Sequence, residues 1–471
     1  MCIRDSYTIA PSYKDVNTIW CGTDDGLIHV TRDGGKTWKN VTPPEITSWS
    51  KVSLMDASHT DANTVYAAVN RIRCDDMRPH IYKTNDGGKT WKEIVNGLPN
   101  DPINVVREDP IRKGLLFAGS ERAVYVSFDD GENWQSLRLN MPATSIRDLV
   151  IKDDDLVIGT HGRSFWILDN ITPLRIDPYI FKLDLSTIAG ILYKPQTTYR
   201  VRWNMYTDTP VPQEEAAGEN PPDGAMIDYY LHENANAVSL EIHDQKGNSI
   251  RKYSNRDTLY KIGDVNIPHY WIRPQQILSA EPGHHRFLWD MKYAPLNLAV
   301  SYPISATYMN TEPNQTAPWI MPGTYTATLT VDGKVYTQTF TIKMDPRVKT
   351  SLQNLKLQHD LSLQCYNRRE ECMKILEDIR SYHAKIRRQL TNASAAVADE
   401  LNKKDKLARE LEATPQGSTE PSFGRLNNGF ASVFNVLQDS DMPPTTQMIN
   451  AVKELNQQMI VLKKKWEDLK K

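Results

Sequence analysis

The sequence predicts a mainly β protein with an α-helical tail: a partial β-propeller of about four blades, an immunoglobulin-like or fibronectin-like β-sandwich, and a C-terminal helical hairpin or bundle. Three observations predict it. An octapeptide turn pattern occurs three times, alternating β-type runs continue to residue 343, and from residue 346 the apolar period becomes helical. We therefore expect a propeller at 1–170, a linker at 171–222, a sandwich at 223–345 and helices at 346–471.

The octapeptide has a hydroxyl residue first, Asp third, Gly fifth and Trp last, and its copies begin at Thr31, Thr84 and Ser127. Each copy follows a short β-type run, so it closes one strand and starts the next. The aspartate can accept hydrogen bonds from nearby backbone amides, the glycine adopts a positive φ without strain, and the tryptophan buries a large ring. We interpret these aspartates as turn-forming residues and not as catalytic ones.

The spacing of the octapeptides matches the size of one propeller blade. A four-strand scheme therefore repeats through about residue 170, starting with an innermost strand at 7–10. The last unit has no octapeptide after Asp169, so its fourth strand is expected to be missing. The predicted strands of the three later units are 51–56, 64–68, 80–84 and 91–95; 103–108, 115–119, 123–127 and 134–137; and 145–151, 155–159 and 164–169.

A proline-bearing polar stretch at 209–223 indicates a surface connection. After it, alternation of apolar and polar residues returns, and the Asp332-Gly333 pair predicts a hairpin turn. Several short antiparallel strands in about 120 residues favour a small sandwich. The expected sandwich strands are 225–231, 238–243, 285–289, 324–331 and 334–343.

The last segment shows the helical period most clearly, because Met448, Val452, Leu455 and Met459 alternate steps of four and three and so share one face. A similar stripe begins at Cys372, and a charged stretch from about 397 to 411 is expected to pair with these helices. The residues 417–424 are interpreted as a loop. Packing within the chain is favoured over a coiled-coil partner.

Composition excludes several classes of partner. The 471 residues are 39% hydrophobic with a mean hydropathy of −0.54, and no apolar run approaches the about 18 residues of a membrane span. A net charge of −2 and a pI near 6.6 give no electrostatic case for nucleic acid. The five cysteines have no metal-ligand spacing, so we expect free thiols, no metal and no cofactor.

The three octapeptides resemble those of the Asp-box, or BNR-repeat, propellers, a group that includes sialidases, xyloglucan-degrading hydrolases and sortilin-type receptors. The resemblance extends over nearly the whole chain, through Gly159–Asp169, Gly283–Asp290 and Pro322–Tyr325, to exported bacterial proteins labelled sortilin-like or glycosyl-hydrolase-like. It implies a propeller fold and an extracellular, periplasmic or cell-envelope location. A sortilin-like receptor also needs a membrane anchor or a cysteine-rich module, which this chain lacks.

The first six residues have neither a basic region nor an apolar region, so they are no signal peptide. They run directly into the predicted first strand and are similar to assembly-derived leader sequence. We expect an N-terminally truncated chain that lacks upstream blades. The oligomeric state is not indicated by the sequence.

If the octapeptide joins strands three and four of a blade, the turns between strands two and three open on the opposite face. These turns are polar in every blade and ring the place where propellers commonly bind ligands. The predicted ligand-binding residues are Asp24, Arg71, Arg73, Asp75, Asp76, Arg78, Arg122, His161 and Arg163.

Two functions follow from this face. The first is binding of a glycan or protein ligand by an exported propeller. The alternative is a glycoside hydrolase, which needs one protonated and one ionised carboxyl group about 5–9 Å apart. Its predicted catalytic residues are Asp25, Glu121 and Asp148. The structural alternative for each acid is that it caps a turn or forms a surface ion pair. The arginines are expected to hold a carboxylate as sialidases do, although the tyrosine and glutamate pair of a sialidase is not assignable here.

Overall fold

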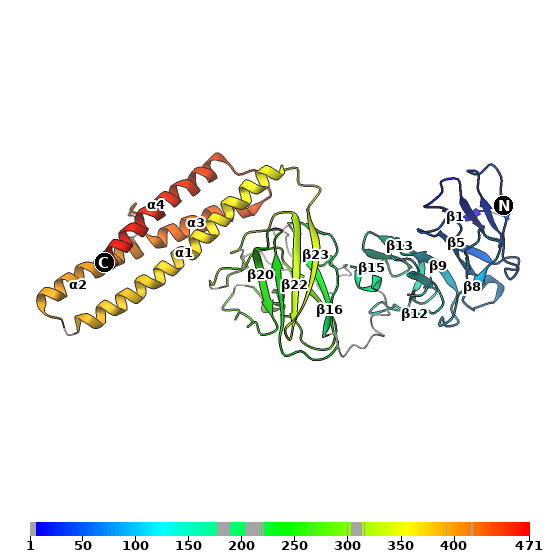
Figure 1. The fold of residues 1–471 in the computed structure, drawn as a ribbon, viewed down its shortest axis with the longest axis horizontal. Helices are drawn as coiled ribbons and strands as arrows, with labels where there is room; N and C mark the ends of the chain where they lie inside the picture. Colours follow the sequence, from blue (N-terminus) through cyan, green and yellow to red (C-terminus); the bar gives the residue numbers. More distant parts are fainter. Residues whose placement is uncertain are drawn as a thin grey trace. The chain divides into compact units, whose positions relative to one another are not determined.

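The computed structural model describes residues 6–176, 189–202, 218, 221–265, 267–298, 300–302, 313–314, 316–391, 393–415 and 418–471. The chain forms two compact units, Met1–Thr187 and Ile188–Lys471, which are described separately (Figure 1). Two sequence predictions lie mostly outside the described residues: the six-residue leader, of which only Ser6 is described, and the proline-bearing connection.

The first unit is a propeller-like series of antiparallel sheets, which we call blades I to IV. The first three have four strands each, in sequence order, and blade IV has three strands among the described residues. The strands are β1 (Ser6–Pro11), β2 (Ile19–Thr23), β3 (Ile28–Thr31) and β4 (Lys39–Asn40) in blade I; β5 (Lys51–Ala57), β6 (Val65–Asn70), β7 (Ile81–Thr84) and β8 (Lys92–Glu93) in blade II; β9 (Ile103–Glu108), β10 (Leu116–Ser120), β11 (Val124–Ser127) and β12 (Gln135–Ser136) in blade III; and β13 (Ser145–Lys152), β14 (Asp155–His161) and β15 (Phe165–Leu168) in blade IV.

Every strand predicted for this unit is present, with ends that differ by a few residues. The blades pack through apolar layers that alternate along each strand. Trp20 and Val30 of blade I meet Met55 and Ala67 of blade II, and Tyr66 of blade II faces blade III. The fourth strand that the sequence leaves out of the last unit is also absent from the described part of blade IV.

The second unit begins with two sheets that share one apolar core. The five predicted strands form, and three short strands join them that the sequence did not predict. Two of these, β16 and β17, lie inside the predicted linker 171–222, which is therefore not a free connection throughout. The sheets are β16 (Gly190–Leu192), β18 (Ala225–Leu231) and β21 (Gly283–Trp289), and then β17 (Thr198–Arg200), β23 (Lys334–Met344), β22 (Gly323–Val331), β19 (Val238–His243) and β20 (Ser249–Ser254).

A tail of four helices completes this unit: α1 (Leu352–Leu390), α2 (Ala395–Glu412), α3 (Phe423–Asp439) and α4 (Thr446–Lys470) (Figure 1). Val452, Met459 and Trp466 of the predicted stripe are buried, as are Cys365 and Cys372. The helix α3 was not predicted, because no helix was assigned between the expected loop 417–424 and the last helical stripe. Among the described residues, none of the helices combines the length and the apolar character that a bilayer crossing needs.

Candidate ligand-binding face

The octapeptides join the third and fourth strands of blades I to III, and the loops between the second and third strands lie at the other strand ends. Because neighbouring strands are antiparallel, the two sets of turns occupy opposite faces of the blades. We call the second set the loop face. It contains Asp24 and Asp25 of blade I, the long segment 71–80 of blade II, Glu121 of blade III and Gly162 of blade IV.

The octapeptide aspartates form turns. Asp86 accepts hydrogen bonds from the backbone nitrogens of Lys89 and Thr90, both at 2.9 Å, and from the Thr90 hydroxyl at 2.7 Å. These bonds, led by the one from the Thr90 backbone, hold the pKa of Asp86 well below its usual range. This geometry agrees with the interpretation that the octapeptide aspartates form turns.

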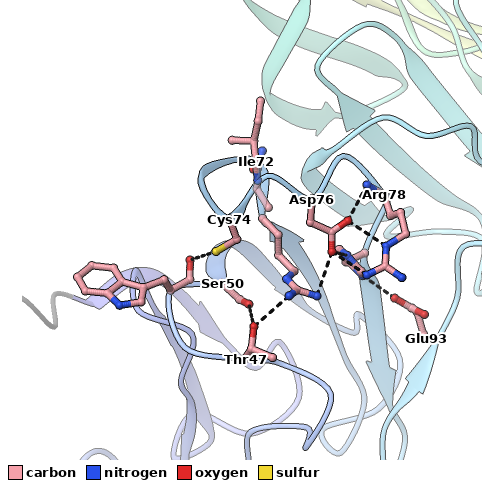
Figure 2. A network of polar contacts seen from close by, with 11 residues as sticks. Thr47, Ser50, Ile72, Cys74, Asp76, Arg78 and Glu93 are labelled. Carbon is pink, nitrogen blue, oxygen red and sulfur yellow. Dashed lines mark hydrogen bonds and ion pairs between the residues drawn. The ribbon is translucent and has the colours of Figure 1, made fainter.

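Asp76 is the centre of the polar network that Figure 2 shows in the long loop of blade II. Arg71 lies 3.1 Å from its carboxylate, Arg78 donates to it at 2.9 Å, and His80 lies 3.2 Å away. The other ring nitrogen of His80, Nδ1, is 2.7 Å from Glu93. The hydrogen bond from Arg78 is the main reason why the pKa of Asp76 lies far below its usual range, so this carboxyl stays ionised.

A second ion pair joins the loops of blades I and II. The Arg73 guanidinium contacts both carboxylate oxygens of Asp24 and lowers the pKa of Asp24. Asp25 accepts a hydrogen bond from the Thr23 hydroxyl at 2.6 Å, which is a turn contact. Asp75 follows the short 3-10 helix at Ile72–Cys74 and has a left-handed backbone with φ of 59°. Of the arginines expected to hold a carboxylate, Arg71 and Arg78 are thus paired with Asp76 of their own loop, and Arg73 is paired with Asp24 of the neighbouring blade.

Trp49 is the residue of this face that the sequence analysis did not single out. Its side chain is 52% exposed, and its φ of 68° is strained for an aromatic residue. Its backbone is fixed by two contacts, from its nitrogen to the Asp25 carbonyl at 3.0 Å and from the Cys74 sulfur to its carbonyl at 3.5 Å. Figure 2 shows the neighbouring hydrogen bonds of Thr47. The backbone of Trp49 is therefore held between the Asp25 and Cys74 loops, and its side chain stays about half exposed.

In blade III, Glu121 lies at the end of a chain of buried amides. Asn70 donates to Asn104 at 2.7 Å, and Asn104 donates to Glu121 at 3.0 Å. Burial by itself raises the pKa of Glu121, but the Ser145 hydroxyl, the hydrogen bond from Asn104 and the charge of Arg147 together outweigh it, so this pKa lies below its usual range. Glu121 is an ionised residue and not a proton donor.

Asp101, in the loop before β9, was also missed. It is 2% exposed and accepts a hydrogen bond from the Ser120 hydroxyl. Burial is the main cause that raises its pKa, and the nearby charge of Glu121 raises it further. A backbone hydrogen bond of 3.0 Å from Glu121 to Pro102 joins the two loops. One carboxyl with a raised pKa and one with a lowered pKa therefore lie in neighbouring loops.

Asp148 belongs to a different environment. It lies within strand β13 and contacts Arg107 of β9 at 3.1 Å. The same guanidinium is 3.3 Å from Asp56 of blade II, so it links three successive blades. We find Asp148 in this ion-pair network between strands and not in a loop with Glu121.

The remaining predicted residues lie in the loops of blades III and IV. Arg122 is exposed, with its Nε 3.9 Å from Asp101. His161 ends strand β14, and Arg163 follows it in an exposed turn. The backbone nitrogen of Arg163 donates to the Thr160 hydroxyl at 3.1 Å. Among the residues that the structure describes, no group of His, Cys, Asp and Glu side chains has the arrangement of a metal site.

No protein-family model and no curated protein matches the chain. Solved structures match at low similarity: YCF48 from Cyanidioschyzon merolae (20% identity, 36% of this chain and 54% of that chain, TM-score 0.27) and the GH74 enzyme of Niastella koreensis (16% identity, 35% and 22%, TM-score 0.28). The GH74 xyloglucanase from Xanthomonas campestris has 11% identity over 53% of this chain and 36% of that chain, with a TM-score of 0.30. The matched part is therefore about half of the YCF48 chain and less of the two enzymes. At these scores the likeness carries no inference about function.

Proposed function

We propose that this chain is an exported propeller protein that binds a glycan or protein ligand on its loop face, with a glycan as the favoured class. The observation that carries the proposal is Trp49, an exposed indole held in a strained backbone conformation. Strain of this kind persists only where the surroundings enforce it, and it gathers at ligand sites. A flat indole face packs against the C–H face of a sugar ring and removes apolar surface from water.

The charges of the loops next to Trp49 favour a ligand without strong charge of its own. Arg73 is paired with Asp24, while Arg71 and Arg78 are paired with Asp76, so these cations are already compensated. The pairs still present hydrogen-bond donors and acceptors to sugar hydroxyls at their exposed edges. By the resemblance of the octapeptides, such a ligand is met outside the cytoplasm, at the cell envelope or beyond.

Binding of the full chain to an array of neutral and acidic glycans tests the proposal, with Trp49→Ala as the variant. We expect the loss of the indole to weaken binding at least about tenfold. Trp38→Ala is the matched control, because it removes an exposed indole of similar exposure (45%) from an octapeptide turn on the other face. Equal binding by the parent and Trp49→Ala, or an equal loss in both variants, contradicts the proposal.

A glycoside hydrolase remains the second candidate, because Asp101 and Glu121 have pKa values shifted in opposite directions. Such a separation is what an acid and a base or nucleophile require. A screen of chromogenic glycosides with the parent, Glu121→Gln and Asp25→Asn tests it. Turnover that is lost only in Glu121→Gln supports the enzyme with Glu121 as the ionised partner. Absence of turnover in the parent contradicts it.

A further inference from the structure

Blade I has an apolar sheet face that no described part of the chain covers. Its members alternate with the buried core residues of the blade, and the two most exposed are Ile9 (63%) and Trp38 (45%). We call it the open face of blade I, and its residues are Ile9, Ile19, Cys21, His29 and Trp38, of which Ile19 and His29 are partly exposed and Cys21 is buried.

The next two blades have the same face, and there it is buried. In blade I, Ile9 pairs with Cys21 of the second strand; the corresponding first-strand residues are Met55 in blade II and Val106 in blade III. Met55 is 1% exposed and Val106 is fully buried, because each packs against the blade that comes before it. Ile9 is thus exposed because no described blade packs against this face, and not because the face is polar.

Two of the three interfaces between the blades show what such a neighbour offers. The indole nitrogen of Trp91 donates to the Val41 carbonyl of blade I at 2.7 Å, and that of Trp134 donates to the Ile94 carbonyl of blade II at 2.9 Å. Val41 and Ile94 both follow the fourth strand of their blades. Among the described residues, no carbonyl accepts from the indole of Trp38.

The octapeptide glycines repeat the pattern. A Cβ atom added at Gly88 meets the side chain of Val41 at 2.7 Å, and one added at Gly131 meets Ile94 at 2.4 Å. The equivalent Gly35 has open space around it. An aliphatic side chain therefore presses on two of the three octapeptides and is lacking at the third.

We propose that the open face of blade I binds one further four-stranded blade of the same type. The residue directly after the fourth strand of that blade places an aliphatic side chain against Gly35 and a backbone carbonyl within reach of the Trp38 indole. The proposal extends an interface that already occurs twice in succession in this chain, and it does not depend on the ligand proposed above.

A second copy of the chain fits less well. Blade IV does present an apolar outer face, with Val150, Phe165 and Ile167 exposed. However, its sheet has three strands among the described residues, so none of these residues follows a fourth strand and can accept from Trp38. Two copies joined through the described part of blade IV leave the indole uncovered.

The test adds the missing neighbour to the full chain. A copy of Lys51–Pro102 is joined to Ser6, because Ile103 pairs with Ser120 in blade III as Ser6 pairs with Thr23 in blade I. Parent and extended proteins both carry Ile9→Cys and Cys21→Ala, and the rate of alkylation at position 9 is measured by mass spectrometry. The exposed thiol of Cys74 on the loop face is the internal reference.

We expect the extension to slow alkylation at position 9 at least about tenfold while Cys74 reacts as before. A further variant of the extended protein, with Ile94→Asp in the added copy and Trp38→Ala, is expected to restore the fast rate. Equal rates in parent and extended proteins overturn the proposal. Protection in the parent that grows with protein concentration also overturns it, because a second copy then occupies the face.

Discussion

Asp33 illustrates at the scale of one residue how a short side chain fixes a turn. Its carboxylate accepts hydrogen bonds from the Thr37 hydroxyl at 2.7 Å, the Thr37 backbone nitrogen at 2.9 Å and the Thr31 hydroxyl at 2.8 Å. Each bond favours the ionised form. The bond from the Thr37 hydroxyl contributes most, and together they lower the pKa of Asp33 from 3.8 to about 2.

We predict that Asp33 titrates near pH 2 in the folded protein and that Thr37→Val moves its pKa back toward 3.8. Because the folded pKa lies below the unfolded one, the stabilisation from this carboxylate is complete above about pH 4 and is lost as the pH falls toward 2. Carbon-13 NMR of the carboxyl measures both values. Thr37→Ser keeps the hydroxyl and is expected to keep the low pKa; a Thr37→Val midpoint equal to that of the parent contradicts the assignment.

The positions of the loops that carry the candidate site were predictable, because the turn signals beside them are local in sequence. The presence of Asp101 and Trp49 at this face was not predictable. The burial of Asp101 depends on Ser120, and the backbone of Trp49 depends on Cys74, contacts that join separate loops. The environment of Asp148 was not predictable either, because no local pattern indicates that Arg107 is its partner. Partners that are distant in sequence decide which acids are free to act.

At the scale of elements, the strands of the blades were predicted well because octapeptides and glycine turns delimit them. Helix α3 was missed although Phe423, Leu426, Phe430 and Phe434 follow a helical spacing. Glycine lowers the helix propensity there, but Gly429 serves packing, since an added Cβ would meet Leu455 of α4 at 2.8 Å. The short strands β16 and β17 carry almost no signal of their own, because pairing with β18 and β23 defines them.

We predict that Phe430→Ala lowers the free energy of unfolding of the second unit by about 3–5 kcal/mol. Phe430 is fully buried in the core that α3 forms with α1 and α4, so its removal leaves a cavity. Urea unfolding followed by the helical circular dichroism signal measures the change. Val436→Ala on the same helix is the control, because Val436 is exposed and its loss is expected to cost little. Similar effects of the two substitutions contradict the packing described here.

At the scale of the whole molecule, the sheets and helices of the second unit are joined by a buried polar contact. Asp441, between α3 and α4, receives a hydrogen bond of 2.6 Å from Arg200 at the end of β17, and Arg202 lies 2.9 Å from the same oxygen. The Trp319 backbone nitrogen donates to Gln438 of α3 at 3.0 Å. Arg200 and Asp441 are both nearly fully buried, so Arg200 relies on this carboxylate to balance its charge, while Asp441 also contacts Arg202.

We predict that Asp441→Asn separates the unfolding of the helices from that of the sheets. The substitution leaves Arg200 buried without its carboxylate, and breaking a buried pair in this way costs about 3–5 kcal/mol. Differential scanning calorimetry is expected to show two transitions in this unit where the parent shows one. Asp399→Asn is the matched control, since Asp399 forms an exposed pair with Lys403 at 3.7 Å on α2 and contributes little to stability. If Asp441→Asn only lowers the temperature of a single transition, the prediction is contradicted. Contacts other than the one at Asp441 then hold the helices to the sheets.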